Sequence, residues 1–332
     1  MPLLLDKKNL ELLAKRTKTK KGRAVKPSKK AERELLARLN DLWTKVLLPS
    51  TERIKSLIAQ GAHPVAIADE MEQMLRTANA SYAVMSRDIL DKWKMSLDME
   101  TRRAVQRSFS VSLGVDISAT MDTPVVIGEL NGVSKPFSST QSAEQAGATN
   151  IKTISTQDAL SIGGLEAANL IKSIPGEYLG RVAQAVADNF TGKPLPEGRS
   201  LLEQVQHIGG VSRRRAKLIA RDQTSKMTGM LNATRQMSLG VSEYVWRTVK
   251  DNRVVGNPSG VSPVGSSGHH NHYVMEGVRC RWDDPTLWYK TGAWVKRPDK
   301  APKTHPGQEI QCRCYAEPII NPKQIFEMAI AA

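Results

Sequence analysis

The stretch SRRRAKLIARDQTSKMTGMLNATRQMSLGVSEYVWRTVKD (residues 212–251) decides the fold class, because its apolar spacing changes partway along. Up to Leu231 apolar residues recur every three or four positions, which predicts a long helix capped by Ser212 and ended by Gly240. Residues Val241–Val249 then alternate between two faces and predict a strand. We therefore expect a mainly α protein with a small α+β C-terminal domain.

N-terminal to this stretch, the helical period recurs in pieces separated by Pro and Gly. A loop-rich connector with two short strands, rich in Gly, Ser, Thr and Asn, is expected between Ser108 and Gly164. The expected helices are one from Ala31 that ends at Pro49, one over Ile67–Trp93, one from Leu165 to Phe190 that breaks at Pro175-Gly176, and a short one over Leu201–Ile208 before Gly209-Gly210.

These signals predict five consecutive parts. They are a flexible basic arm (1–30), a helical N-terminal region (31–107), a loop-rich connector (108–164), a helical segment (165–240) and a compact, Cys- and His-containing α+β end (241–332) with a last strand around Ile310–Ile320.

Positive charge is concentrated at the two ends of the chain. The net charge is +15 over 332 residues, and Lys15–Lys30 holds nine basic residues and no acid. Like-charge repulsion favours an extended arm that a polyanion such as nucleic acid neutralises, although an arm that only confers solubility has the same composition. The candidate nucleic-acid contacts are Lys15, Arg16, Lys18, Lys20, Lys21 and Arg23, together with Arg213 and Arg214, which follow a Gly209-Gly210 pair weakly similar to a helix-hairpin-helix turn.

Several protein classes are disfavoured. The chain has no apolar run of about 20 residues, so no transmembrane helix is expected, and the order of charges at its start is wrong for a secretory signal. Three cysteines, an odd number, favour a reducing compartment. The motifs of serine hydrolases, P-loop NTPases and dinucleotide enzymes are missing from the sequence.

A series of dispersed motifs covers about residues 165–320. It includes Ile219-Ala220-Arg221-Asp222-Gln223-Thr224, Asn232, Arg235, Gly240, WRT-x2-D-x-R (Trp246, Arg247, Asp251, Arg253), a His before Gly277, and PG-x4-CRC (Pro306, Gly307, Arg313 and its flanking cysteines). In this order the elements resemble the phage Mu F-like minor head protein family, also called the phage head morphogenesis proteins.

The resemblance implies a structural role in tailed phages and no enzymatic activity. Such a protein lies inside the capsid at the portal vertex of the virion, and in the host cytoplasm during assembly. Its implied partners are the portal protein, packaged double-stranded DNA and the major capsid or scaffold protein, with no membrane in the assembled head. It would assist head assembly and DNA packaging or ejection.

One departure from the family pattern concerns the histidine. The Gly-, Pro- and Ser-rich insertion Val254–Gly268 separates the D-x-R pair from the next histidines. His272 is the best counterpart by its spacing to Gly277, and His269 is the alternative.

Metal chemistry is conceivable only in the C-terminal part, where four histidines and three cysteines fall within 46 residues. Imidazole and thiolate are the usual zinc ligands, so His272, His305, Cys312 and Cys314 form a candidate structural zinc site. On a strand, Cys312 and Cys314 would face the same side, with Arg313 opposite. The alternative is a small domain in which these side chains pack and hydrogen-bond without a metal.

Two further hypotheses concern the charged and histidine-rich motifs. An ion pair of Asp251 with Arg253 or Arg313 that fixes loop geometry is a simpler interpretation than catalysis. The stretch HHNH (residues 269–272) leaves open a metal-dependent, HNH-like nuclease or other DNA-processing enzyme. A polymorphic toxin is disfavoured, because only about a dozen residues follow the last motif.

Overall fold

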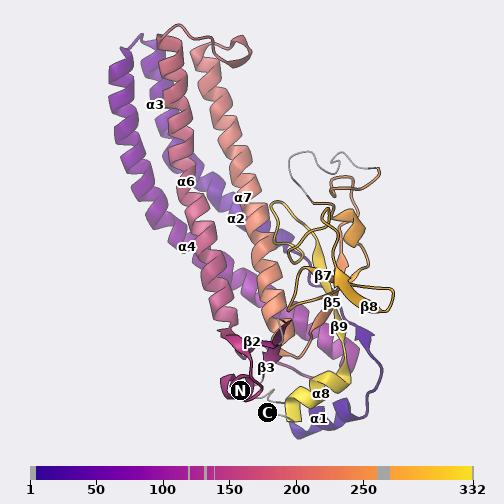
Figure 1. Cartoon of the computed structure of the whole chain (residues 1–332). Coiled ribbons are helices and arrows are strands. Elements are labelled where there is room, and N and C mark those ends of the chain that lie inside the picture. The colour runs from indigo at the N-terminus through magenta and orange to yellow at the C-terminus, as the bar shows by residue number, and fades with distance from the viewer. Residues whose placement is uncertain (1–4, 119, 131–132, 138, 260–269, 331–332) are drawn as a thin grey trace. The chain divides into compact units, whose positions relative to one another are not determined.

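The structure, a computed structural model, describes residues 5–118, 120–130, 133–137, 139–259 and 270–330. It is mainly α-helical with a small α+β C-terminal region, as expected (Figure 1). The chain divides into two compact units that interleave along the sequence instead of following one another. The first unit comprises Met1–Ser28, Leu97–Ile162 and Thr224–Ala332, and the second comprises Lys29–Ser96 and Gly163–Gln223.

Helices make up the second unit. Trp43 and Tyr178 lie at its core, with their rings edge to face and centroids 5.1 Å apart, and the Tyr178 hydroxyl lies 2.6 Å from that of Thr51. The elements that lie in this unit wholly or in part are α2 (Lys29–Leu42), η1 (Trp43–Leu47), α3 (Leu48–Ala59), α4 (Pro64–Leu113), α6 (Thr156–Phe190), η2 (Pro196–Gly198) and α7 (Leu201–Ser238).

Pro49 does not end the first helix, contrary to our prediction. The π-helical segment η1 precedes α3, and Pro49 occupies the first turn of α3. Proline is tolerated there, because its missing N–H is one of the groups that a helix start leaves unpaired in any case.

The predicted breaks at Pro175-Gly176 and Gly209-Gly210 are also wrong, since α6 and α7 run through them without interruption. Burial of Ile171 and Ile174 on one face of α6 offsets the hydrogen bond that Pro175 cannot donate. A side chain at Gly209 would begin 3.5 Å from the Trp43 ring, so this glycine lets α7 approach the indole closely. A helix-hairpin-helix turn therefore does not exist at this point.

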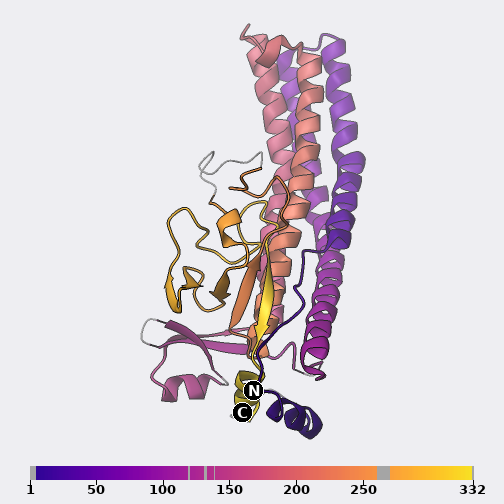
Figure 2. The ribbon, with the colours of Figure 1, turned by 90° about the vertical axis from the view of Figure 1, so that its right-hand side faces the viewer.

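The first unit contains two antiparallel sheets. In the larger one the strand order is β1-β9-β5-β6-β7-β8, and in the smaller one it is β3-β2-β4. Figure 2 shows β9, in yellow, beside β5, in orange. The strands are β1 (Lys20–Lys21), β2 (Val125–Leu130), β3 (Val133–Phe137), β4 (Thr149–Ile154), β5 (Glu243–Arg247), β6 (Arg279–Arg281), β7 (Leu287–Lys290), β8 (Ala293–Lys296) and β9 (Tyr315–Ile320).

The transition from helix to strand occurs where we predicted it. Gly240 has a φ of 78°, its N–H donates to the Met237 carbonyl, and the N–H of Val241 donates to the Gln236 carbonyl. This pair of bonds is the Schellman end of a helix, in which glycine accepts the left-handed conformation without strain. It leads directly into β5, whose Tyr244 and Trp246 side chains are fully buried.

The connector is more regular than we predicted. It holds three strands and the short helix α5 (Thr140–Gln145), and α4 extends 20 residues beyond Trp93 to Leu113. The extension of α4 carries the buried side chains Val105 and Phe109 into one apolar cluster of this unit. In the C-terminal part, the elements without a predicted counterpart are the strands β6, β7 and β8, the segment η3 (Tyr273–Met275) and α8 (Pro322–Ile330).

The N-terminal segment is not a flexible arm over residues 5–30. Helix α1 (Lys7–Ala14) is capped by Asp6 and contacts α8, and β1 pairs with β9. Leu13 and Val25 are buried in the apolar cluster that includes Phe109. These apolar anchors hold the segment against the unit despite its charge. Among the helices of the described residues, none has the length and apolar composition that a membrane crossing requires.

A fully buried arginine ties α7 to two acidic residues of the same unit. The Arg235 guanidinium donates to the carboxylates of Asp98 and Asp122 and to the Asp98 backbone carbonyl. Arg102 also pairs with Asp122, but its side chain is 45% exposed. The two arginines therefore share an acidic partner and differ in burial.

We expect Arg235→Ala to lower the free energy of unfolding by about 3 kcal/mol, because it leaves two carboxylates without their buried partner. Arg102→Ala, the matched control, should cost about 0–1 kcal/mol. Urea denaturation followed by circular dichroism measures both. Equal decreases for the two variants would contradict the claim that the buried Arg235 stabilises the fold more than the exposed Arg102.

Candidate functional site

The dispersed motif residues of the C-terminal part meet around β5. The backbone N–H of Trp246 donates to the Val278 carbonyl at 2.8 Å, and the backbone N–H of Gly277 donates to the Trp246 carbonyl at 2.9 Å. Gly277 has a φ of 77°, a conformation that glycine adopts without cost, so this motif glycine allows the chain to turn beside β5.

Arg247 links β5 to β9 and to the turn before Gly277. Its guanidinium donates to Glu317 at 2.7 Å and to Glu276 at 3.2 Å, while the Thr248 N–H and hydroxyl donate to the other Glu276 oxygen. Burial alone would raise the pKa of Glu276, but the bonds from Thr248 and Arg247 outweigh it and lower the pKa. Glu276 is thus an ionised structural acceptor.

The expected ion pair of Asp251 is present. Both nitrogens of the Arg313 fork bind the Asp251 carboxylate, at 2.7 and 2.8 Å, and Arg253 lies 3.4 Å from it. Hydrogen bonding from Arg313 lowers the pKa of Asp251. The bidentate pair fastens the loop after β5 to the residue between Cys312 and Cys314.

The Pro306-Gly307 turn is anchored on α7. Gly307 has a φ of 89°, and a side chain on it would begin 3.1 Å from the Ser225 backbone oxygen. The Ser225 hydroxyl donates to the Cys312 carbonyl, and the Gly307 N–H donates to the Cys312 sulfur at 3.3 Å. These contacts explain why this turn requires glycine.

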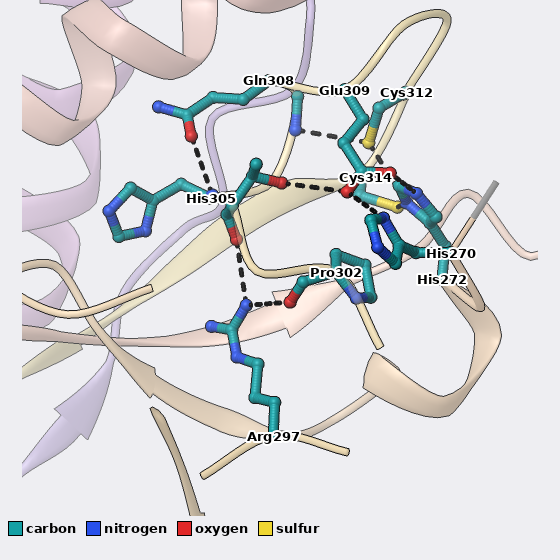
Figure 3. Close-up of polar contacts among 11 residues, drawn as sticks. His270, His272, Arg297, Pro302, His305, Gln308, Glu309, Cys312 and Cys314 are labelled. Atoms are coloured by element: carbon teal, nitrogen blue, oxygen red, sulfur yellow. Dashed lines mark hydrogen bonds and ion pairs between the residues drawn. The ribbon is translucent and has the colours of Figure 1, made fainter. Parts of the chain in front are cut away.

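The turn brings three potential metal ligands together. One ligand atom each from His272, Cys312 and Cys314 lies within 4.8 Å of the others, and all three side chains are buried (Figure 3). The His272 Nδ1 atom is 3.4 Å from the Cys312 sulfur and 3.5 Å from the Cys314 sulfur. The cysteines precede β9 rather than lying on a strand, yet both sulfurs face one imidazole while Arg313 turns to Asp251.

Close contact among the three side chains shifts their pKa values in different directions. Burial alone would lower the pKa of His272, but hydrogen bonds to Cys312 and Glu309 raise it to about 9. The Cys314 thiol and the His272 imidazole lower the pKa of Cys312, whereas the neighbouring Cys312 sulfur raises that of Cys314. Protons are thus held between close donor atoms, where a metal cation can displace them.

The spacing of the donor atoms suits a thiophilic metal ion. A tetrahedral zinc, with bonds of about 2.3 Å to sulfur and about 2.0 Å to nitrogen, separates the two kinds of donor by about 3.5 Å. The observed separations are 3.4 and 3.5 Å. This buried His-Cys-Cys group can therefore hold a metal ion, and its donors are of the softer kind that zinc accepts.

His305 does not belong to this group, so its prediction as a ligand is wrong. Its Nδ1 atom lies 3.0 Å from the Tyr244 hydroxyl, and its ring packs against Trp282, pointing away from the sulfurs (Figure 3). Burial and the nearby Arg297 charge lower the pKa of His305 to about 3. Cys280, whose burial raises its pKa to about 11, lies on β6 outside the group as well.

Glu309 is the candidate site residue that our sequence reasoning missed, and His270, which it considered only within the HHNH stretch, lies beside it. Glu309 binds the His272 Nε2 atom with one oxygen and the His270 Nδ1 atom with the other, both at 2.8 Å. Glu309 lies in the spacer of PG-x4-CRC, in an irregular turn with no periodicity to mark it. The other members of HHNH are Asn271, whose side chain accepts from the Val274 N–H, and His269, which lies outside the described residues.

The candidate nucleic-acid residues fall into two groups. Lys15, Lys18, Lys20, Lys21 and Arg23 are exposed and Arg16 is half-buried, all in the first unit, and within the described part of the chain none of the six forms an ion pair. Arg213 and Arg214 are exposed on α7 in the second unit, where the Arg213 guanidinium lies over the Trp43 ring, 5.5 Å from its centroid.

Comparisons with known proteins leave the function open. No family model and no solved structure matches the chain. A protein of Haemophilus influenzae, described as an uncharacterized protein, is 28% identical over 171 residues, which is 51% of this chain and 31% of that relative. The match thus spans about a third of the relative's length.

Proposed function

We propose that this chain is a minor head protein of a tailed phage. It would lie inside the capsid at the portal vertex, contact the portal protein and the packaged DNA, and assist head assembly and DNA packaging or ejection. The resemblance of the dispersed motifs to Mu F-like proteins suggests the role. The observation that carries it is that the strongest of these motifs close into one cluster around β5 and bind one another.

A cluster of this kind supports an architectural role. The polar motif side chains Arg247, Asp251 and Arg313 are all engaged in ion pairs inside the unit. An enzyme needs comparable groups directed at a substrate. The HNH-like nuclease stays an alternative that the described contacts do not favour, since His270 and His272 are both held by Glu309.

The basic N-terminal segment supports contact with DNA. Lys20 and Lys21 lie on β1, at the edge of the larger sheet, and Lys18 and Arg23 flank them. Exposed cations without carboxylate partners are available to phosphates, and each phosphate neutralised releases condensed counterions. The anchors Leu13 and Val25 hold these charges on a defined surface.

Exposed apolar side chains on the helices of the second unit support contact with another protein. Val84 and Met95 on α4 are 73% and 64% exposed, and Leu165 on α6 is 64% exposed. Burying such side chains against a partner lowers the free energy of the complex. In our proposal this partner is the portal.

The His272, Cys312 and Cys314 group would hold a structural zinc ion. The two nitrogen-to-sulfur distances are those expected around a tetrahedral zinc ion, and Gly307 supplies an N–H to one sulfur. The indole N–H of Trp246 is buried in the same apolar cluster as Cys312 and Cys314, with no hydrogen-bond partner. Bound zinc would join the turn that carries His272 to the segment that carries Cys312 and Cys314, and would stabilise the α+β C-terminal part.

The proposed location predicts that the chain co-purifies with assembled portal oligomers and is present in mature heads. Heads assembled without it should be impaired in packaging or infectivity. Pull-down with purified portal and mass spectrometry of heads measure these properties. Heads that lack the chain and remain unchanged in composition and infectivity would refute the role.

For DNA, replacement of Lys18, Lys20, Lys21 and Arg23 together by Ala should weaken duplex binding in a salt-dependent manner. The slope of log K against log salt should fall by about 0.9 for each phosphate that the variant no longer neutralises. Lys45→Ala is the control, because Lys45 is exposed but paired with Asp41 in the second unit. An unchanged slope in the fourfold variant, measured by fluorescence anisotropy, would exclude this segment as the DNA-binding surface.

For zinc, we expect about one ion per chain by elemental analysis. Cys312→Ser, Cys314→Ser and His272→Gln should each lose the metal, and chelation should lower the melting temperature of the unaltered chain. His305→Gln and Cys280→Ser are the controls that keep it. A chain that takes up no zinc on reconstitution, or a His305→Gln variant that loses it, would contradict this site.

A further inference from the structure

Glu309 occupies an unusual position beside the proposed metal ligands. Its two carboxylate oxygens bind two imidazoles, one oxygen at 2.8 Å from His272 Nε2 and the other at 2.8 Å from His270 Nδ1 (Figure 3). The Thr304 hydroxyl donates to the second oxygen at 3.3 Å. Glu309 is 15% exposed, so these partners replace most of its contact with water.

The contact decides which nitrogen of His272 faces the sulfurs. With Nε2 bound to Glu309, the Nδ1 atom is directed at Cys312 and Cys314, at 3.4 and 3.5 Å. If the ring turned over, a carbon would face the sulfurs and the bond to Glu309 would break. A carboxylate on one imidazole nitrogen therefore leaves the other oriented for a metal.

We propose that Glu309 is the positioning residue of the metal site: it holds the His272 ring with Nδ1 toward the two sulfurs and keeps the proton on Nε2. This inference rests on the proposed zinc site and names a residue that does not itself touch the ion. The ligand class is a thiophilic divalent cation, of which zinc is the common example.

His270 and Thr304 have a supporting role in this arrangement. Each binds the Glu309 oxygen that does not face His272, so together they limit rotation of the carboxylate. The His270 side chain is 39% exposed, whereas that of His272 is 9% exposed. Because His270 acts only through Glu309 and is the more exposed of the two (39% against 15%), its removal should affect the site less than removal of Glu309.

Glu317 provides a matched control. Its carboxylate is 21% exposed and paired with a cation, Arg247, in the same unit, but it has no contact with His272. Glu309→Gln and Glu317→Gln each replace a paired, mostly buried carboxylate by an amide of the same shape. Only the first change removes the acceptor that orients His272.

The experiment compares zinc affinity in the full-length chain by competition with a chromogenic chelator, and records the visible spectrum of the cobalt-substituted protein. We expect Glu309→Gln to weaken zinc binding about 10- to 100-fold and to alter the cobalt spectrum. Glu317→Gln should bind zinc within about twofold of the unaltered chain, and His270→Gln should lie between the two.

The outcomes separate this inference from the zinc proposal itself. If the unaltered chain binds zinc and Glu309→Gln binds it equally well with an unchanged cobalt spectrum, the positioning role is refuted and the zinc site stands. If Glu309→Gln lowers only the melting temperature, Glu309 is a structural staple and the inference is likewise refuted. If the unaltered chain binds neither zinc nor cobalt, the zinc proposal fails and this inference fails with it.

Discussion

Burial of the two aromatic side chains of β5 is the constraint on which the first unit depends. Tyr244 and Trp246 are fully buried in an apolar cluster that includes Cys280 of β6 and Ala316 of β9, the two strands that pair with the edges of β5. Burying two large aromatic side chains stabilises a fold by several kcal/mol, on the order of its whole net stability. The same pairing fixes the ends of these strands, and the candidate metal ligands lie close to those ends.

Charged residues are used in two different ways in this unit. Around β5 they are paired at short range, as in Asp251 with Arg313 and Arg247 with Glu317, so they hold loops in place. Along the N-terminal segment all the cations but the half-buried Arg16 are exposed, and they are positioned by apolar anchors rather than by acids. Paired charges hold the loops of the unit in place, and unpaired cations can bind a polyanion. Our proposal requires both functions.

Local signals predicted the elements well where packing agreed with them. Gly240 ends α7, and the alternation after it forms β5. The signals failed where packing opposed them: Pro175 and Gly209 lie inside continuous helices, because buried faces and a close approach to Trp43 outweigh the local preference for a break. The prediction of a flexible N-terminal arm was wrong for the same reason. The buried side chains of Leu13 and Val25 hold the segment in an apolar cluster despite its charge.

By itself, the sequence determined the mainly helical class, the switch to strands at Gly240 and the candidate ligands His272, His305, Cys312 and Cys314, because these follow from periodicity and from side-chain chemistry. Only the tertiary structure decided that, of the two histidines, His272 lies against the two sulfurs while His305 contacts Tyr244, and that Glu309 binds the other nitrogen of His272. The physical reason is that these residues lie in turns without a repeat. The distances between these side chains are set by strand pairing and by the anchoring of Gly307 on α7. Neither contact can be predicted from the local sequence.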